Sequence, residues 1–277
     1  MKKSIGYHIF IWGVTVVLAF LILFPVFWIF TSSITEKELL FTTPVTYFPD
    51  SPTLQNYISL FREVDVGGLA LNTLIVAVLA IIGSLTVSLL AAYAFARFKF
   101  RGASTAYSLL VFSAMLPVIM TLIPMFQTYR TLHLHDTHLG LVILYVSGFI
   151  PFTTMSFVTF IQQIPYSLEE AAAVDGANIR IRIFKVLFPL MRPAIATMAI
   201  INFINSMNEF MIPLVFTNVK ATPLSVGLTL IPRINQYNVP WEKISALASL
   251  MLVPIIIFVV FFEKHIIDGL TAGSVKQ

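Results

Sequence analysis

Several long runs of this sequence contain no charged residue. The first extends from Ile5 to Ile34, and the second, from Val66 to Ala96, is equally free of Asp, Glu, Lys and Arg. A helix needs about 20 predominantly apolar residues to cross the hydrocarbon core of a bilayer. Because both runs exceed that length, each predicts a helix that spans a membrane.

Four further stretches meet or approach the same length. They are Gly102 to Tyr129, Thr137 to Leu168, Pro193 to Val219 (interrupted only by Glu209) and Ile244 to Phe262. Of the 277 residues, 58% are hydrophobic and 11% are charged, whereas a soluble domain carries about 25% charged residues. The sequence therefore predicts an all-α polytopic membrane protein with six transmembrane helices, and it argues against a soluble enzyme.

The basic residues indicate how these helices are oriented. With six spans both termini lie on one side, where eleven Lys and Arg accompany five acidic residues, against six and seven on the other side. Lys and Arg are enriched in cytoplasmic loops, so both termini are expected in the cytoplasm. The formal net charge of +4 reflects this bias, and no nucleic-acid partner is inferred from it. The absence of Cys removes disulfides and thiolate metal sites.

These spans and loops suggest four segments. Residues 1–34 form an N-terminal transmembrane helix, 35–65 an external loop with an amphipathic helix, 66–262 a five-helix core that includes the cytoplasmic loop 165–193, and 263–277 a cytoplasmic tail. The amphipathic helix either lies at the membrane interface or docks an external partner. Its apolar positions, spaced as on one helix face, are Leu54, Tyr57, Ile58 and Phe61.

The cytoplasmic loop reads as two short helices joined by a turn. Ser167 and Glu170 have the spacing of a capping box, so a helix should start there. Gly176 can turn the chain with a positive φ, and a second helix should run from about Asn178 to Leu187. The alanines before the turn would let another protein approach closely. The alternative is an ordinary charged linker between two spans.

This loop resembles the EAA coupling motif of binding-protein-dependent ABC importer permeases, E-A-A-x-x-x-G followed by nine residues and I-x-L-P. The second half of the motif keeps Pro189 but has Val186 for Ile and Phe188 for Leu. The first half matches at Glu170, Ala171, Ala172 and Gly176.

Other stretches are similar to the carbohydrate branch of these permeases, in particular the maltose-type second permease. The segment Ala91 to Gly102 is similar to the stretch that follows the second span. Asn208, Phe210 and Pro213 fit the pattern W-N-x-F-x-x-P-L, with Met207 at the Trp position. The other similar stretches are Thr222 to Leu228 and the tail Gly269 to Gln277.

The resemblance implies a type I ABC importer permease fold that works by alternating access in a bacterial or archaeal plasma (inner) membrane. It implies a second homologous permease, two ATP-binding-cassette ATPase subunits, an extracytoplasmic sugar-binding protein, a sugar substrate and membrane lipid as partners. The chain lacks G-x-x-x-x-G-K-[ST], so the ATPases would bind ATP and Mg, while this chain would bind no cofactor and catalyse no reaction.

The resemblance also assigns roles to particular segments. The external loop Asn218 to Lys243 would approach the binding protein, and the tail after Leu270 would reach toward the ATPases. The residues that would couple the permease to an ATPase are Glu169, Glu170, Ala171, Ala172, Asp175, Gly176, Ala177, Phe184 and Pro189.

Polar residues in the fifth span are candidates for the translocation pathway. Asn202, Asn205 and Glu209 fall on one helix face, and Asn208 lies beside them. Amides and a carboxylate suit sugar hydroxyls, which need both donors and acceptors. The alternative is hydrogen bonding between helices, here with the partner permease.

The sequence raises two other interpretations. His133, His135, His138 and Asp136 form a cluster that could suggest a metal site, but a metal site needs fixed geometry and a supporting shell, so no metal is expected.

The rival functions are an ABC permease for a non-sugar solute and a stand-alone secondary transporter or membrane enzyme. The second rival gives no reason for the EAA loop.

Overall fold

The structure is a computed structural model that describes residues 5–233 and 238–272, with side chains described for residues 6–233 and 238–261. The described residues form helices and loops, and none of them lies in a strand, which confirms the all-α class. The longer helices are α1 (Ile5–Ser33), α2 (Gln55–Glu63), α3 (Val66–Arg97), α4 (Ala103–Ser113), α5 (Val118–Thr131), α6 (His138–Gln163), α7 (Ser167–Val174), α10 (Arg192–Asn208) and α13 (Trp241–Ala272). The short elements are η1 (Lys37–Leu39), α8 (Ile179–Ile181), η2 (Arg182–Leu187), α9 (Phe188–Leu190), α11 (Met211–Phe216) and α12 (Leu224–Leu230).

Four of the described helices, α1, α3, α6 and α13, are long and apolar enough to cross a membrane. The number reaches six if each of two bent pairs counts as one span: α4 and α5 meet at 96°, and the segment Ile179–Leu190 meets α10 at 74°.

Two predicted spans are therefore not continuous helices. The third breaks before α5, where Pro117 is extended (φ −62°, ψ 125°) and has no N–H to continue the preceding helix. The fifth was predicted to extend to Val219, but α10 ends at Asn208 because Glu209 is extended (φ −67°, ψ 122°) and its side chain accepts the backbone N–H of Ile212 in α11.

The described chain divides into two compact units. The described residues of one unit are 5–67, 227–233 and 238–253, and those of the other are 68–226 and 254–272. In the first unit, Asn56 of α2 donates hydrogen bonds to the carbonyls of Ser33 (2.9 Å) and Thr35 (2.8 Å). The predicted amphipathic helix is therefore present, but it attaches through the buried Asn56 and Leu60, while Leu54, Ile58 and Phe61 stay exposed.

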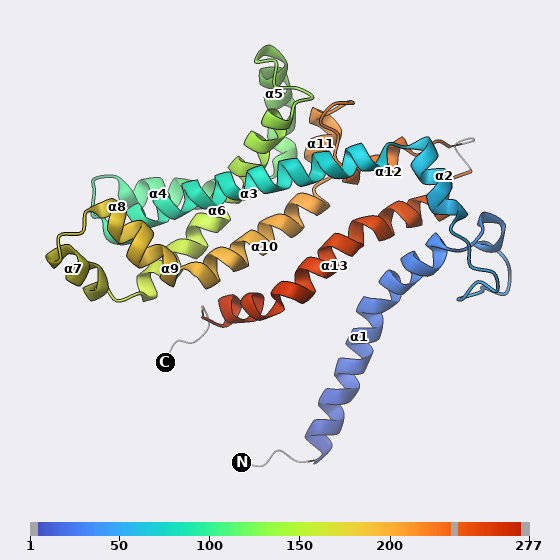
Figure 1. Ribbon diagram of the computed structural model, residues 1–277, viewed down its shortest axis with the longest axis horizontal. Coiled ribbons are helices and arrows are strands. Elements are labelled where there is room, and N and C mark those ends of the chain that lie inside the picture. The colour runs from blue at the N-terminus through green and yellow to red at the C-terminus, as the bar shows by residue number, and fades with distance from the viewer. Residues whose placement is uncertain (1–4, 234–237, 273–277) are drawn as a thin grey trace. The chain divides into compact units, whose positions relative to one another are not determined.

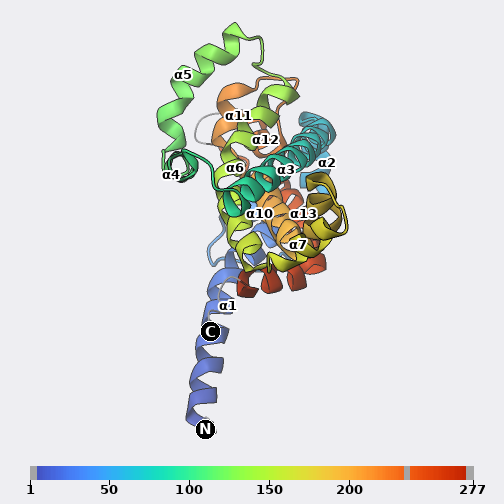
Figure 2. The same ribbon diagram turned by 90° about the vertical axis from the view of Figure 1, so that its left-hand side faces the viewer.

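Helices α3, α6 and α10 lie side by side in the second unit (Figure 1). Together with η2 they bury one apolar cluster. This cluster includes Leu89 of α3, Phe157 of α6, Leu187 of η2 and Met198 of α10. Within a bilayer, such packing stabilises through van der Waals contact between the helices, because lipid tails are as apolar as these side chains. Helix α5 projects away from this layer (Figure 2). The hairpin that contains η2 packs on the layer through the same apolar cluster.

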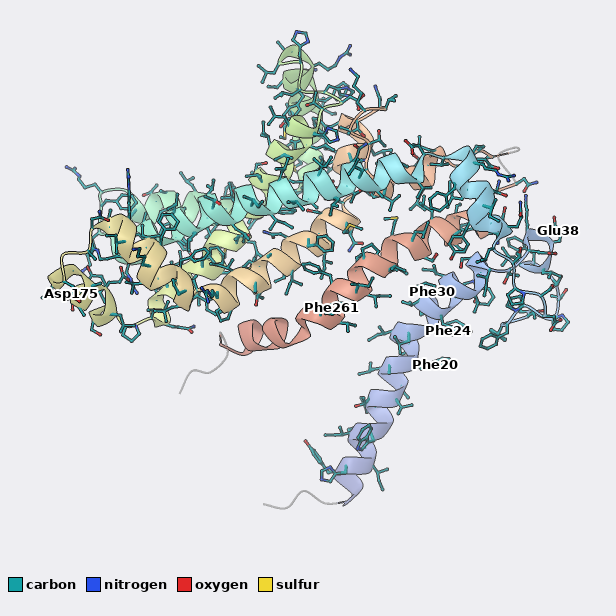
Figure 3. All side chains as sticks on the ribbon, viewed as in Figure 1. Phe20, Phe24, Phe30, Glu38, Asp175 and Phe261 are labelled. Carbon is teal, nitrogen blue, oxygen red and sulfur yellow. The ribbon has the colours of Figure 1, made fainter. Side chains whose placement is uncertain are left out.

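Helix α1 carries apolar side chains that are exposed among the described residues. Its most apolar 18-residue window contains no buried residue, and Phe20 and Phe24 project from it (Figure 3). A helix that is hydrophobic all round is stable in lipid or against another protein.

Candidate coupling loop and translocation pocket

The loop that was predicted to be cytoplasmic forms a hairpin of short helices. Gly176 ends α7 with φ +83°, its N–H bonds to the carbonyl of Ala173 (3.0 Å), and the N–H of Ala177 bonds to that of Ala172 (2.9 Å). This is the Schellman arrangement that satisfies the last carbonyls of a helix and favours Gly at the left-handed position. Asn178 then caps α8 by accepting the N–H of Ile181 (3.0 Å). Gly176 therefore fixes where the first helix of the hairpin ends, and Asn178 fixes where the second begins.

The second arm of the hairpin continues past the predicted end. It passes from α8 through η2, which is a π-helix, and into α9, which ends at Leu190. Ile183 and Leu187 of η2 are buried. These two side chains pack the arm onto the α3–α6–α10 layer through the shared apolar cluster.

A buried ion pair joins the base of the hairpin to α3. Glu169 is 0% exposed, and its Oε1 accepts a hydrogen bond from Nε of Arg97 at 2.7 Å. Its Oε2 accepts one from the hydroxyl of Tyr93 at 2.8 Å. Arg97 also donates to the carbonyl of Ile164 (2.8 Å), and its guanidinium lies 5.5 Å from the ring centroid of Tyr166. The start of α7 is therefore held to the end of α3 by several contacts.

Glu169 and Glu170, adjacent in the motif, have different environments. Glu170 is exposed, because consecutive helix residues point about 100° apart. Val174 is 88% and Phe184 56% exposed, so the hairpin presents apolar surface, and Asp175 lies at its tip (Figure 3). Of the other predicted coupling residues, Ala171, Asp175 and Gly176 are exposed, and Ala172, Ala177 and Pro189 are half-buried.

The predicted capping box does not form, although the predicted start of the helix is right. Helix α7 begins at Ser167, but Tyr166 occupies the N-cap position and no side chain caps the helix. Glu169 and Glu170 in the first turn instead place negative charge near the positive end of the helix dipole. Ser167 is the first helical residue and not the N-cap, so it cannot form the predicted box with Glu170.

The polar residues predicted for the translocation pathway separate into two groups. Asn202 is 1% exposed, and its amide donates to the hydroxyls of Ser84 (3.3 Å) in α3 and Thr153 (3.2 Å) in α6. Asn205 and Asn208 are exposed, and Glu209 is half-buried. Asn202 thus ties three helices of this chain together, whereas the other three lie at a surface.

Those three residues share a pocket of about 360 Å³ with side chains of α6. Tyr145 reaches it from α6; it is 3% exposed, and its hydroxyl has no hydrogen-bond partner among the described residues. Oε1 of Glu209 accepts the N–H of Ile212 at 3.0 Å. The full lining is Val118, Leu144, Tyr145, Gly148, Phe149, Asn205, Asn208, Glu209 and Ile212.

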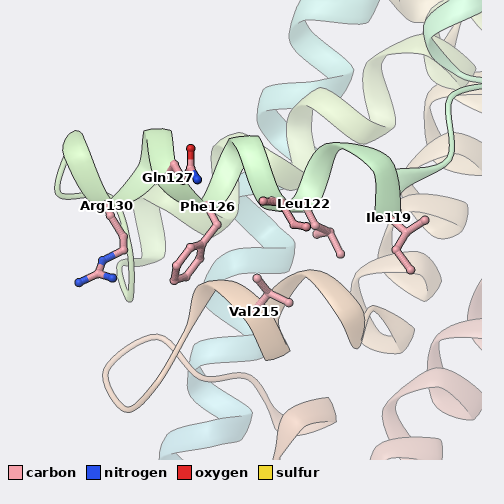
Figure 4. Close-up of a pocket in the computed structure, with 7 residues that line it drawn as sticks. Ile119, Leu122, Phe126, Gln127, Arg130 and Val215 are labelled. Atoms are coloured by element: carbon pink, nitrogen blue, oxygen red, sulfur yellow. The ribbon is translucent and has the colours of Figure 1, made fainter.

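A larger groove of about 660 Å³ follows α5 (Figure 4). Ile119, Leu122 and Phe126 line it with Val215 of α11, and Arg130 lies at one end with its guanidinium 5.9 Å from the Phe126 ring centroid. Its walls offer few hydrogen-bond partners. It is therefore a poorer candidate for a polar substrate than the pocket at α10.

Asp136, considered as part of a histidine cluster, organises a loop instead. Its carboxylate accepts the backbone N–H groups of residues 218–221 at 3.0–3.2 Å. Burial alone would raise the pKa of this carboxyl. The four backbone hydrogen bonds stabilise the charged form and together lower the pKa by more than burial raises it, so it lies below its ordinary value. Asn72 donates to the carbonyls of Lys220 and Thr222 and lies 2.7 Å from Nε2 of His138. Within the described residues, no three His, Cys, Asp or Glu side chains are grouped as metal ligands.

The family model described as "Binding-protein-dependent transport system inner membrane component" matches residues 84–271, more than half of the chain. The matched region contains the ion pair, the hairpin and the pocket. The chain belongs to this family. It is a multi-pass inner membrane component, a permease subunit and not an ATPase.

Similar proteins of the family come from several organisms. The chain is 36% identical to the sulfoquinovosyl glycerol transport system permease protein of Agrobacterium fabrum, over 92% of this chain and 89% of that protein. It is 31% identical to the trehalose transport system permease protein of Mycobacterium tuberculosis, over 92% of each. It is 29% identical to the trehalose/maltose transport system permease protein of Thermococcus litoralis, over 94% of each.

Solved structures show the same fold. A chain of a bacterial ABC transporter involved in the import of the acidic polysaccharide alginate aligns with a TM-score of 0.80 and 25% identity, covering 95% of this chain and 99% of that one. A second structure, of the alginate transporter with a periplasmic protein bound to alginate pentasaccharide, aligns with a TM-score of 0.67 and 15% identity over 92% of each chain.

Some functional residues were not found by sequence reasoning. Tyr93 and Arg97 lie in a stretch that was noted only for its family similarity, and a basic residue closing an apolar run was the available signal. The role of Asp136 gave no signal, because backbone N–H groups are not visible in a sequence. Residues 234–237 of the predicted binding-protein loop and residues 273–277 of the predicted tail lie outside the described residues.

Proposed function

We propose that this chain is the membrane-spanning permease of an ATP-driven importer that carries a sugar or oligosaccharide into the cell. The main support for this function is the hairpin, which has an exposed apolar tip and a base that a buried ion pair holds to α3. The sugar substrate is supported by the names of the relatives, which transport trehalose, maltose and sulfoquinovosyl glycerol.

The hairpin would transmit motion from an ATPase. A surface that contains Ala171, Ala173 and Val174 lets a second protein approach closely. Force on this tip would pass through Glu169 to Arg97 and so to α3, and through the buried Leu187 to the helix layer. In this assembly two ATPase subunits bind ATP and Mg, and a second homologous permease completes the pathway beside this chain.

The orientation follows from the charges. The hairpin carries Arg180, Arg182 and Lys185, so it faces the cytoplasm together with both termini. The loop that Asp136 holds then faces outward, where an extracytoplasmic binding protein would deliver the sugar. The membrane is the plasma (inner) membrane of a bacterium or archaeon.

The pocket at α10 would lie on the sugar pathway. Asn205 and Asn208 offer amide donors and acceptors, and Glu209 offers an acceptor, which together match sugar hydroxyls. Asn202 serves the pathway indirectly, by fixing α10 against α3 and α6.

Affinity purification in mild detergent, with mass spectrometry of the co-purifying chains, tests this function. We expect a second permease and a P-loop ATPase, and ATP-dependent uptake of sugar after reconstitution with the binding protein. Transport of a non-sugar solute by the same complex would replace the substrate and keep the importer. Transport by this chain alone, without ATP, would contradict the proposal.

A further inference from the structure

The pocket at α10 has one ionisable side chain whose charge is not balanced by the residues around it. Glu209 lines the pocket, and no Lys, Arg or His is among the described residues that line it. The two ion pairs within the described residues join Arg97 to Glu169 and Lys243 to Glu63, so neither uses Glu209. The pocket therefore has a negative wall.

The carboxylate of Glu209 is held in place by one hydrogen bond, and one of its oxygens can still accept others. Its Oε1 accepts the N–H of Ile212, and its backbone carbonyl accepts the hydroxyl of Ser225 at 2.6 Å. Its Oε2 receives no hydrogen bond from the described residues, and a carboxylate has about four acceptor positions. A hydroxyl donor from a ligand would complete this group with a strong, charge-assisted bond.

The other polar groups of the pocket are neutral and able to donate. Asn205 and Asn208 each carry an amide. The hydroxyl of Tyr145 is buried without a partner among the described residues, and a buried polar group normally has one. Tyr145 and Phe149 add aromatic surface. Neutral donors, one carboxylate and aromatic rings are complementary to a ligand that is rich in hydroxyls and carries no negative charge.

We infer that this pocket selects uncharged sugars and disfavours acidic ones, and that Glu209 is the residue that discriminates. This inference rests on the proposed function and narrows its substrate class. A uronate or sulfonate group in the pocket would lie near the Glu209 carboxylate with no cation from this chain to offset the repulsion. At the separations a pocket of this size allows, such repulsion should weaken binding by about tenfold or more.

The relatives make this distinction informative. Two of the similar proteins are named for acidic substrates, alginate and the sulfonate sugar sulfoquinovosyl glycerol, whereas others are named for trehalose or maltose, which are neutral. Overall similarity to these proteins therefore does not separate acidic from neutral substrates, and the inference rests on the pocket itself.

The test measures binding to the complete importer complex in nanodiscs, without its binding protein, by saturation-transfer difference NMR. The probes are three neutral sugars, maltotriose, cellotriose and trehalose, each paired with its C6-oxidised form, so that the two members of a pair share one sugar skeleton and differ in a hydroxymethyl or a carboxylate group at C6. The variants are Glu209→Gln, whose side-chain oxygen can still accept the N–H of Ile212, and the control Glu38→Gln. Glu38 is exposed and does not line the pocket.

We expect at least one neutral sugar to bind about tenfold or more tightly than its acidic counterpart. Glu209→Gln should reduce that ratio about tenfold, Glu38→Gln should leave it unchanged, and 0.5 M salt should reduce it in the native complex because salt screens charges (the Debye length is about 10 Å at 0.1 M and shorter at higher salt). A ratio near one in the native complex, a ratio that Glu209→Gln does not change, or no binding of any probe would overturn the inference. Co-purification with the ATPase and ATP-dependent uptake would still stand in those cases, so the proposed function fails by a different measurement.

Discussion

Arg97 and Glu169 form a buried ion pair 72 residues apart in sequence, with Nε of the arginine 2.7 Å from Oε1 of the glutamate. The pair joins the end of α3 to the first turn of α7. Both side chains are at most 9% exposed, so water does little to compensate either charge if the other is removed.

The first prediction follows from that burial. Arg97→Met should destabilise the protein by about 3–5 kcal/mol, because it leaves an unpaired charge in the interior, and it should reduce sugar uptake at least tenfold at equal membrane abundance. Thermal unfolding of the detergent-solubilised complex and an uptake assay measure the two effects.

The half-exposed pair Lys243–Glu63 (2.6 Å) supplies the matched control. Lys243→Met should cost no more than about 1 kcal/mol, as exposed pairs do. The double variant Arg97→Met with Glu169→Leu should recover part of the stability without recovering uptake. Normal uptake in Arg97→Met would contradict the proposed route from the hairpin to α3.

The second prediction concerns the turn of the hairpin. Gly176 has φ +83°, and a Cβ at this position would meet only open space, so Gly176→Val strains the backbone by about 1–2 kcal/mol without a clash. Uptake should be lost while the protein still inserts into the membrane. Gly102 is an internal control, with φ +85° and the same open space; Gly102→Val should carry a similar strain and keep most uptake.

The third prediction separates the two glutamates of the motif. Glu170→Lys changes an exposed side chain, so unfolding should shift by no more than about 0.5 kcal/mol, yet co-purification of the ATPase and uptake should both fall sharply. Glu36→Lys, at an exposed position in the loop after α1, makes the same charge change and should do neither. ATPase retention by Glu170→Lys at the native level would remove Glu170 from the docking surface.

The fourth prediction is a dependence of stability on pH. The pKa of Asp136 is lower in the folded protein than in the unfolded chain, so its stabilising contribution is fully present above the unfolded value of about 3.9. It is lost as the pH falls from there through the folded pKa. Unfolding of the native protein measured from about pH 6 to about pH 2.5 should show this loss, and Asp136→Asn should be less stable above about pH 5 and less sensitive to acid. Equal acid sensitivity in both proteins would contradict it.

The fifth prediction compares two asparagines on the same helix. Asn202→Ala should destabilise the protein by about 1–3 kcal/mol, because it removes hydrogen bonds that join buried groups of three helices. Asn205→Ala should leave stability nearly unchanged and reduce sugar uptake several-fold. The reverse pattern would place Asn202 rather than Asn205 on the pathway.

Much of the fold could be predicted because it depends on local features. The long uncharged runs located α1, α3, α6 and α13, and Gly176 with Asn178 located the hairpin turn. The breaks were harder: Gly102 to Tyr129 was predicted as one span, and the bend at Pro117 divides it into two helices. Glu209 was assumed to continue a helix, whereas its side chain caps the next one.

The candidate site was predictable only in part, for a physical reason. A helical pattern specifies which residues share a face, but not whether that face meets water or another helix. Asn202 and Asn205 therefore looked equivalent in the sequence, although one is buried against Ser84 and Thr153. The partners of Glu169 lie on another helix, and no local pattern contains that information.

The π-helical segment η2 sets the rotational phase between the hairpin and α10. A π turn contains roughly one residue more than an α turn, so deleting a residue between Arg182 and Leu187 would let the segment rewind as an ordinary α-helix. The hairpin residues that precede the segment would then rotate by about 100° about its helix axis. Val174 and Asp175 would point in a different direction. In the proposed coupling, a hairpin that differs by one residue here would dock on its ATPase at a different angle, even with the same residues at the tip.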